Sequence, residues 1–202
     1  LYPKITLSAD YPISQAFLTV DNQKIEGVIK DNYDAEFLLS KPLKPNKDYI
    51  YKVQVVSYAG ELSKEEYIHF RTLPIHEDKV WVEAIIDNKP RIKVYKGTKI
   101  VKQVKCINNQ MISLPTLGTY YIQGRTKQAD GEGYKKDENY LIKINDECIL
   151  QSHPDDAQEE IKETSFSKNN EIMHYTKIHI NQEDAKWIYY NIPDNAMVII
   201  HN

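Results

Sequence analysis

The stretch Tyr49-Ile50-Tyr51-Lys52-Val53-Gln54-Val55-Val56 has the pattern of a strand that is buried on one face. Tyrosine or valine recurs at every second position, and successive side chains of a strand point to opposite faces. The turn-rich run Lys41-Pro42-Leu43-Lys44-Pro45-Asn46-Lys47-Asp48 precedes it, and the turn Ala59-Gly60-Glu61 follows it. We therefore expect an antiparallel strand here and further strands around it.

Similar β-rich runs continue on both sides of this strand. They occupy residues 5–7, 17–20, 35–39, 67–72, 79–85, 91–95, 99–104 and 198–200. Two segments, 155–161 and 181–191, have helical features instead. In the second, Asn181 is a suitable N-cap, and Ala185, Ile188 and Tyr189 form an apolar stripe. The sequence predicts a mostly β protein with one or two short helices.

The chain divides at a candidate linker, Thr72-Leu73-Pro74-Ile75-His76-Glu77. Strands with polar turns before it predict a small β-sandwich over residues 1–74, and a second domain over 75–202 follows. The run from Leu43 to Thr72 resembles bacterial immunoglobulin-like or fibronectin-III-like modules: a leucine and a Pro-Asn turn, a Tyr-x-Val-x-Val strand, an Ala-Gly turn and a final Phe-x-Thr strand. The resemblance implies a module that spaces or presents another domain.

Composition excludes several classes of protein. With 202 residues, of which 41% are hydrophobic, the chain can bury a core, so wholesale disorder is excluded. The net charge of −3 and the scattered basic residues leave no nucleic-acid footprint. Two cysteines exclude a disulfide-dense scaffold and an all-cysteine zinc site. No run is long enough to span a bilayer, and because the chain starts at Leu1 without Met, we expect a mature or trimmed fragment.

Three blocks in the second half resemble the L,D-transpeptidase, or YkuD, family. They are Arg91-Ile92-Lys93-Val94-Tyr95-Lys96-Gly97, then Pro115-Thr116-Leu117-Gly118-Thr119-Tyr120-Tyr121-Ile122, and finally Asp184-Ala185-Lys186-Trp187-Ile188-Tyr189-Tyr190-Asn191-Ile192-Pro193 with Val198-Ile199-Ile200-His201. The blocks keep the family's order and cover about residues 79–202. The resemblance implies a mostly β catalytic-type domain, whose working members cross-link peptidoglycan.

The family's active-site motif is changed at every chemical position. The motif reads Ser-His-Gly-Cys-x-Arg, with an Asp seven residues after the Cys, and its thiolate attacks a peptide carbonyl. Counting back from the family's Asp, here Asp184, places Lys177 in the nucleophile loop where the Cys is expected. Tyr175, Thr176 and His179 then stand at the His, Gly and Arg. The resemblance therefore implies that this chain has no catalytic residue.

The family's second histidine, which lies upstream, is also replaced. The best register places Gln151 at that position, and a slip of two residues would place His153 there. Cys106 and Cys148 lie in neither motif, and free cysteines are most often small buried hydrophobes.

Several polar residues remain candidates for binding in the former cleft. His153, His174 and His179 could converge on a metal, but Lys177 would repel a cation, so we predict neither a metal nor a cofactor. A lysine nucleophile would need a depressed pKa in a dry pocket. The cleft-binding candidates are Ser152, His153, His174, Lys177 and Tyr134.

These observations predict a non-catalytic cell-envelope protein. Its expected partners are peptidoglycan stem peptides or another cell-wall protein, with no nucleic acid, and its expected membrane anchor lies in a segment outside this chain. Two alternatives stay open. One is a working transpeptidase or hydrolase that uses groups such as His153, His174 or Lys177. The other is a structural interaction module whose cleft is filled.

Overall fold

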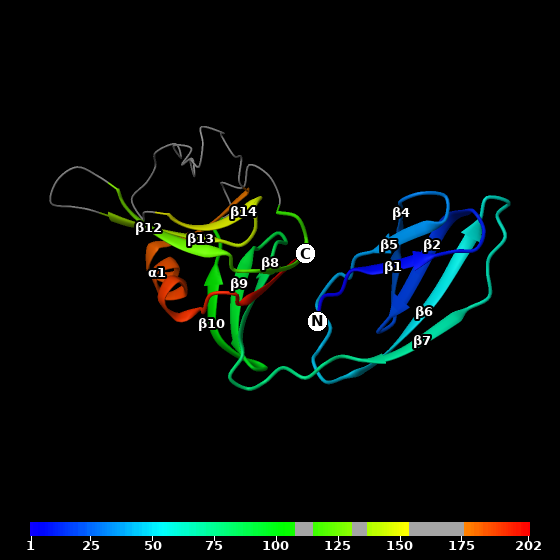
Figure 1. Cartoon of the computed structure of the whole chain (residues 1–202), viewed down its shortest axis with the longest axis horizontal. Helices are drawn as coiled ribbons and strands as arrows, with labels where there is room; N and C mark the ends of the chain where they lie inside the picture. The colour runs from blue at the N-terminus through cyan, green and yellow to red at the C-terminus, as the bar shows by residue number, and fades with distance from the viewer. Residues whose placement is uncertain (108–114, 131–136, 154–175) are drawn as a thin grey trace. The chain divides into compact units, whose positions relative to one another are not determined.

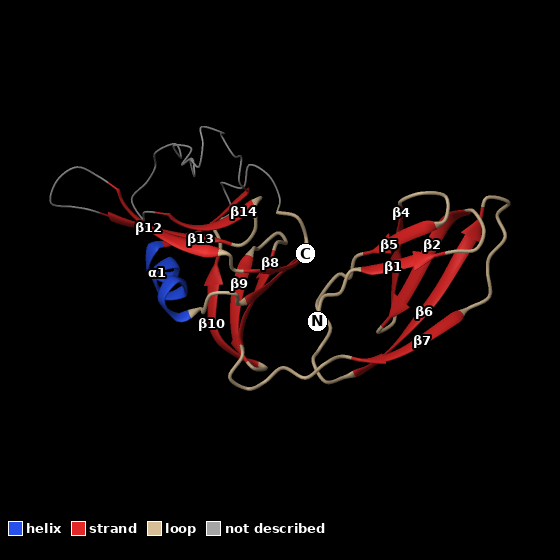
Figure 2. Cartoon of the chain, viewed as in Figure 1, coloured by secondary structure: helices blue, strands red, loops and turns tan. Residues whose placement is uncertain are grey.

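The computed structural model describes residues 1–107, 115–130, 137–153 and 176–202. They form two compact units, Leu1–Ile75 and His76–Asn202, hereafter the N-terminal and C-terminal units. The fold is mostly β, with one helix in the described part of the chain (Figure 2). The expected helical segment at 155–161 lies outside the described residues. Within them, no helix combines the length and the apolar character needed to cross a membrane.

The N-terminal unit consists of two antiparallel sheets (Figure 1). One sheet has the order β1-β5-β4, and the other has the order β3-β2-β6-β7. Strand β2 contacts both β4 and β5, so the two sheets lie against each other. The strands are β1 (Ile5–Ser8), β2 (Ile13–Val20), β3 (Gln23–Glu26), β4 (Val28–Ile29), β5 (Asp34–Phe37), β6 (Asp48–Ser57) and β7 (Glu66–Arg71).

The alternating pattern of β6 builds the core of this unit. Tyr49, Tyr51, Val53 and Val55 are all buried, which confirms the predicted face of the strand. Strand β5 is shorter than the sequence predicts, because the chain leaves the sheet after Phe37. Beyond that point the Tyr2 hydroxyl donates to the carbonyl of Leu39 at 2.6 Å, in place of a strand partner. A buried tyrosine therefore satisfies the backbone carbonyl of Leu39 where the strand has ended.

The C-terminal unit also has two sheets. The first, β10-β9-β8-β16-β11, contains β8 (Val80–Ile85), β9 (Arg91–Lys96), β10 (Lys99–Lys105), β11 (Gly118–Tyr121) and β16 (Met197–His201). The second, β12-β13-β14-β15, contains β12 (Gly124–Asp130), β13 (Asp137–Lys143), β14 (Cys148–His153) and β15 (Thr176–Asn181). The pairs β8·β16 and β14·β15 are parallel, and the other pairs are antiparallel.

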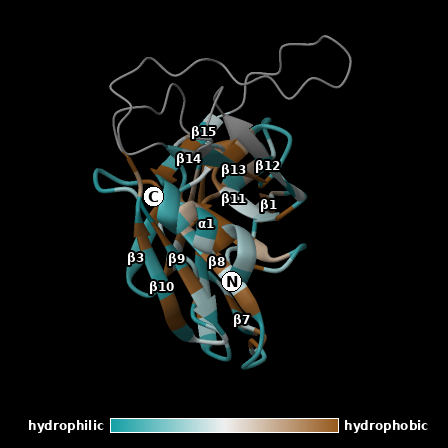
Figure 3. Cartoon of the chain, turned by 90° about the vertical axis from the view of Figure 1, so that its left-hand side faces the viewer, coloured by the Kyte–Doolittle hydropathy of each residue, from teal (hydrophilic) through white to brown (hydrophobic). Residues whose placement is uncertain are grey.

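Apolar side chains from both sheets and from the helix form one core cluster. The strands of this unit carry hydrophobic stretches, which are brown in Figure 3. Buried contributions come from each sheet, and the most completely buried include Val94, Ile200, Ile178 and Ile180. Burial of each such side chain stabilises the fold by roughly 1.5–3 kcal/mol before entropy costs are counted.

Helix α1 (Gln182–Asn191) begins directly after β15 and fixes the end of that strand. The Asn181 side chain accepts a hydrogen bond from the Asp184 N–H at 2.7 Å, as the sequence predicts for an N-cap. Ala185 and Ile188 are buried against the core. At the other end of α1, the Arg125 guanidinium donates to the Tyr189 carbonyl. Both ends of the helix are therefore held by polar side chains.

Candidate functional site

Strands β14 and β15 bring the predicted site residues together. Their parallel register places Gln151 opposite His179 and Ile149 opposite Lys177. Because side chains alternate along a strand, Gln151 and His153 share one face of the sheet with Lys177 and His179. We call these four residues the polar face.

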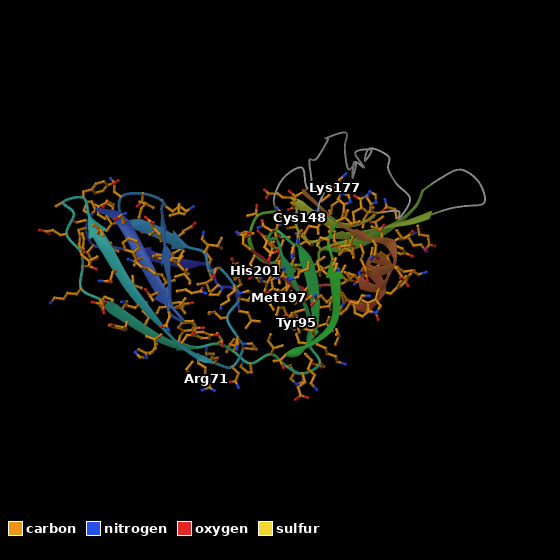
Figure 4. All side chains as sticks on the ribbon, turned by 180° about the vertical axis from the view of Figure 1, so that it is seen from behind. Arg71, Tyr95, Cys148, Lys177, Met197 and His201 are labelled. Atoms are coloured by element: carbon orange, nitrogen blue, oxygen red, sulfur yellow. The ribbon has the colours of Figure 1, made fainter. Side chains whose placement is uncertain are left out.

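The opposite face of the same two strands is part of the core. Cys148 and Leu150 point there from β14, and Ile178 and Ile180 point there from β15. Cys148 and Lys177, both labelled in Figure 4, thus come from neighbouring strands but from opposite faces of the sheet. The thiol of Cys148 is directed away from the position that the resemblance assigns to a nucleophile.

The structure places Lys177 inside β15 and not in a loop. The physical reason is the alternation around it, because Ile178 and Ile180 are β-branched residues that bury fully on the core side. Lys177 is half-buried on the other side. The strand therefore continues through the position at which the resemblance implied a catalytic loop.

Not all of the other residues that the sequence predicts for the site lie on the polar face. Ser152 lies on the core side of β14, where its hydroxyl donates to Asn139 Oδ1 at 2.7 Å and accepts from the Tyr140 N–H at 2.8 Å. Thr176 is buried at the start of β15, on the same side as Cys148. Of the predicted candidates, His153 and Lys177 therefore lie on the polar face, and Ser152 does not. Three further candidates, Tyr134, His174 and Tyr175, lie outside the described residues.

His179 and Gln151 are buried, and some of their polar atoms have no hydrogen-bond partner within the described residues. His179 is 2% exposed and Gln151 is 5% exposed. Within the described residues, neither ring nitrogen of His179 has a partner, and neither has Gln151 Oε1. A buried polar group left in this state costs about 1–3 kcal/mol. Such groups are rare in native proteins and call for a physical explanation.

The surroundings keep the His179 ring neutral. Burial, followed by the positive charge that His153 and Lys177 can carry, lowers the pKa of His179 to about 4. The ring of His153 packs edge-on against it, with ring centroids 5.9 Å apart. At neutral pH, His179 thus presents one N–H donor and one nitrogen acceptor, and Gln151 Oε1 adds a second acceptor.

Neither cysteine can supply a reactive thiolate at this site. Cys148 is buried, which confirms the prediction for that residue, and Cys106 is half-buried against the same core. Burial raises the pKa of both thiols to about 12, so both are protonated at neutral pH. Cysteine-dependent acyl transfer uses the thiolate as its nucleophile, and the chain has no third cysteine.

No metal site is formed by the part of the chain that the structure describes. There, no three His, Cys, Asp or Glu side chains gather closely enough to hold an ion. The two rings that do meet, His153 and His179, lie beside the cationic side chain of Lys177. This neighbourhood favours a neutral or anionic ligand over a cation.

A second buried polar cluster lies on the other sheet and escaped the sequence analysis. The Glu83 carboxylate accepts hydrogen bonds from Tyr95 Oη at 2.7 Å, His201 Nε2 at 3.0 Å and Lys93 Nζ at 3.2 Å. We call these four residues the Glu83 cluster; Tyr95 and His201 are labelled in Figure 4. One signal could have found it, a single acidic residue in the otherwise apolar run Val80-Trp81-Val82-Glu83-Ala84-Ile85.

Burial and hydrogen bonding act in opposite directions on Glu83. Burial favours the neutral acid, but the hydrogen bonds from His201 and Tyr95, together with the charge of Lys93, outweigh it and lower the pKa to about 2. The carboxylate is therefore ionised at neutral pH and fully partnered.

Known proteins are similar to this chain at low sequence identity. No family model matches the chain. The chain is 26% identical over 131 residues to "Putative L,D-transpeptidase YciB" of Bacillus subtilis (strain 168), a match that covers 62% of this chain and 68% of that protein.

Solved structures are also similar to the chain, at low TM-scores and low identity. L,D-transpeptidase 1 of Mycobacterium tuberculosis gives a TM-score of 0.41 at 9% identity, with 96% of each chain covered. A fused Zn-dependent amidase/peptidase/peptidoglycan-binding domain-containing protein of Clostridium acetobutylicum ATCC 824 gives 0.41 at 14% identity, and the match covers 61% of this chain and 52% of that one. The chain is thus similar in sequence to a protein named as an L,D-transpeptidase, and proteins of that name are among its structural neighbours.

Proposed function

We propose that the C-terminal unit is a non-catalytic, L,D-transpeptidase-like domain of a cell-envelope protein, and that it binds peptide through the polar face. The observation that carries this proposal is that both ring nitrogens of His179 in β15 and Gln151 Oε1 in β14 are buried and have no partner within the described residues, whereas Cys148 of β14 faces the core. The similarity to YciB and the altered Ser-His-Gly-Cys-x-Arg motif support it.

The polar face offers hydrogen bonds that suit a peptide group. A peptide unit carries one N–H donor and one carbonyl acceptor. The neutral His179 ring provides one donor and one acceptor, and Gln151 Oε1 provides an additional acceptor. Because these atoms are buried in the unbound structure, a peptide has to displace what covers them before it can satisfy groups that have no partner in the described residues. Lys177 on the same face adds a positive charge suited to a carboxylate, such as those of peptidoglycan stem peptides or of a cell-wall protein.

The remaining parts of the proposal concern the surroundings of this domain. Residues 1–74 would serve as an immunoglobulin-like module that presents residues 75–202 in the cell envelope. A membrane anchor would come from a segment outside this chain. The resemblance of the run from Leu43 to Thr72 to such modules supports this arrangement.

The test combines a binding titration with an assay for cross-linking. The full chain is titrated calorimetrically with a soluble tetrapeptide stem, and the same sample is analysed by mass spectrometry for cross-linked dimer or a thioester. We expect binding without product, and we expect His179→Leu to weaken binding at least ten-fold. His69→Leu, a change at an exposed histidine of β7, is the matched control and should bind as the unmodified chain does.

Each other outcome contradicts a stated part of the proposal. Product above background would show a working enzyme, and absence of both binding and product would favour a structural module. Lys177→Cys should not restore cross-linking, because the positions of Tyr175, Thr176 and His179 are also changed. Recovered activity in that variant would show that only the nucleophile had been lost.

A further inference from the structure

A hollow of about 580 Å³ lies at one end of the N-terminal unit. It is formed where the segment between β1 and β2 meets the segment between β6 and β7. Its lining consists of Tyr11, Pro12, Ser57, Tyr58, Ala59, Glu61, Leu62 and Ser63. All of these residues belong to the N-terminal unit, so the hollow is separate from the polar face.

The walls of the hollow are aromatic and aliphatic side chains that stay open to solvent. Tyr58 is 64% exposed, Leu62 is 61% exposed and Tyr11 is 41% exposed. The Tyr58 hydroxyl donates to Asn32 Oδ1 at 3.2 Å, which restrains the orientation of its ring. Grouped exposed apolar side chains of this kind mark interaction sites, and tyrosine contributes a large surface at low entropic cost.

The floor of the hollow is a fixed turn. Gly60 has φ = +83°, a conformation that other residues rarely adopt. The Ser57 hydroxyl accepts from the Ala59 and Glu61 N–H groups, each at 3.2 Å, and the Ser57 N–H donates to the Glu61 carbonyl at 2.9 Å. These bonds hold the backbone of Glu61 in place before any ligand arrives.

Some polar groups that line the hollow already have hydrogen-bond partners, and others do not. The Ser57 hydroxyl already accepts two bonds, and the Ser63 hydroxyl accepts from the Val55 N–H at 3.0 Å and donates to the Lys64 carbonyl at 2.8 Å. The Glu61 carboxylate makes no hydrogen bond or ion pair with the described residues. It is also the one charged side chain in the lining. The hollow therefore combines two tyrosine faces with an available negative charge.

We propose that this hollow binds a lysine or arginine side chain of a basic peptide segment. A cation over a tyrosine face is attracted by the ring quadrupole, and the Glu61 carboxylate supplies the opposite charge. A saccharide would need many directional hydrogen bonds, and the two serine hydroxyls are already engaged with the backbone. The charge and the aromatic walls together thus favour a cation over a neutral sugar.

The strength of such a contact limits what the partner can be. At an exposed site, one cation–π contact or one ion pair raises an equilibrium constant by only about two- to five-fold. A single ammonium ion would therefore bind weakly, and useful affinity requires a segment with several basic side chains. Asp10, which precedes Tyr11 in sequence, adds a second negative charge next to the lining, and Lys64, which follows Ser63, adds a positive one.

The test uses amide chemical shifts of the full, ¹⁵N-labelled chain. On titration with hexalysine or hexaarginine, we expect shifts centred on Tyr11 and residues 57–63, which weaken in 0.5 M NaCl. Hexaglutamate and a neutral trisaccharide should produce no shifts there. Absence of shifts at the hollow with either basic peptide, or equal shifts with the trisaccharide, would overturn the proposal.

Two variants separate this site from general attraction to an acidic protein. Glu61→Gln and Tyr58→Ala should each lower the affinity for hexalysine about three- to five-fold, while their spectra report that the unit stays folded. Glu66→Gln is the matched control, because Glu66 is exposed on the neighbouring strand β7 and does not line the hollow. An equal loss in the control, or no loss in Glu61→Gln, would contradict the assignment. The result does not depend on the proposed function of the C-terminal unit.

Discussion

The two buried polar clusters of the C-terminal unit differ in how their hydrogen bonds are met. The Glu83 carboxylate has three partners, from Lys93, Tyr95 and His201. On the other sheet, His179 and Gln151 are just as buried, but the two ring nitrogens of His179 and the Gln151 Oε1 atom have no partner within the described residues. A fully partnered cluster is part of the structure itself. The buried atoms of His179 and Gln151 Oε1 carry a cost that a hydrogen-bonding ligand could remove, which is why we propose the polar face for binding.

The largest expected effect comes from breaking the partnered cluster. Glu83→Leu leaves the Lys93 charge and the Tyr95 and His201 groups without their acceptor, so we expect a loss of about 3–5 kcal/mol in the free energy of unfolding. Urea unfolding followed by tryptophan fluorescence measures it. Glu66→Leu, at an exposed site, is the control and should change stability by less than about 0.5 kcal/mol. A loss below about 1 kcal/mol at Glu83 would show that the cluster is not structural.

Acid should act on the two clusters in different pH windows. The pKa of His179 is lowered from 6.5 to about 4, so the unfolded chain binds more protons between these values. The stability linked to His179 is complete above pH 6.5 and is lost as the pH falls to about 4, by on the order of 3 kcal/mol. His179→Gln should flatten the stability profile in this window, as measured by urea unfolding at a series of pH values. An unchanged slope would contradict the neutral, buried ring.

Glu83 should control the lower window. Its pKa is lowered from 4.5 to about 2, so its contribution is present above pH 4.5 and is lost as the pH falls toward 2. Glu83→Gln should therefore reduce the pH dependence below 4.5, to which other carboxyl groups with a lowered pKa, such as Asp87, also contribute, and leave the slope between 4.5 and 6.5 intact. The two variants thus serve as controls for each other, and overlapping effects would show that the clusters are coupled.

Two buried tyrosines of β6 also differ in whether their hydroxyl groups have a hydrogen-bond partner, and the expected energies are smaller. The Tyr49 hydroxyl accepts from the Lys44 N–H at 2.8 Å, whereas the buried Tyr51 hydroxyl has no partner within the described residues. We expect Tyr49→Phe to destabilise the chain by about 1 kcal/mol and Tyr51→Phe to stabilise it by a similar amount. Thermal unfolding of both variants gives the signs. Equal signs would show that the hydroxyl bonds do not decide the energetics.

Local patterns predicted the elements of the fold but not the contacts between distant elements. The strand at residues 49–56 and the Asn181 cap follow from side chains close together in sequence, and the structure has both. The pairing of Gln151 with His179 depends on a parallel register, which alternation alone does not determine. The bond between Glu83 and His201 joins residues 118 positions apart, and although Glu83 stands out in its apolar run, no local pattern predicts His201 as its partner.

The resemblance to the L,D-transpeptidase family predicted which sequence positions come together, but it did not predict the secondary structure around them. It led to Gln151, Lys177 and His179, which the structure brings to one face. It also implied a loop at Lys177, whereas the buried Ile178 and Ile180 keep this segment in β15. Ser152 and His153, both predicted for the cleft, are neighbours in one strand, and neighbouring residues of a strand face opposite sides. Alternation therefore separates the two, as their contacts show.

The central proposal is that His179 and Gln151 Oε1, which have no hydrogen-bond partner within the described residues, take part in binding a peptide. The ring nitrogens of His179 test it most directly. Their ¹⁵N chemical shifts are recorded at pH 7, with His179→Gln used to assign the signals, before and after addition of the tetrapeptide stem. We predict a neutral ring without hydrogen bonds in the unbound chain, and shifts of at least one ring nitrogen toward a hydrogen-bonded value on binding. Ring shifts that stay unchanged at saturating peptide, or a ring already hydrogen-bonded without it, would contradict the claim.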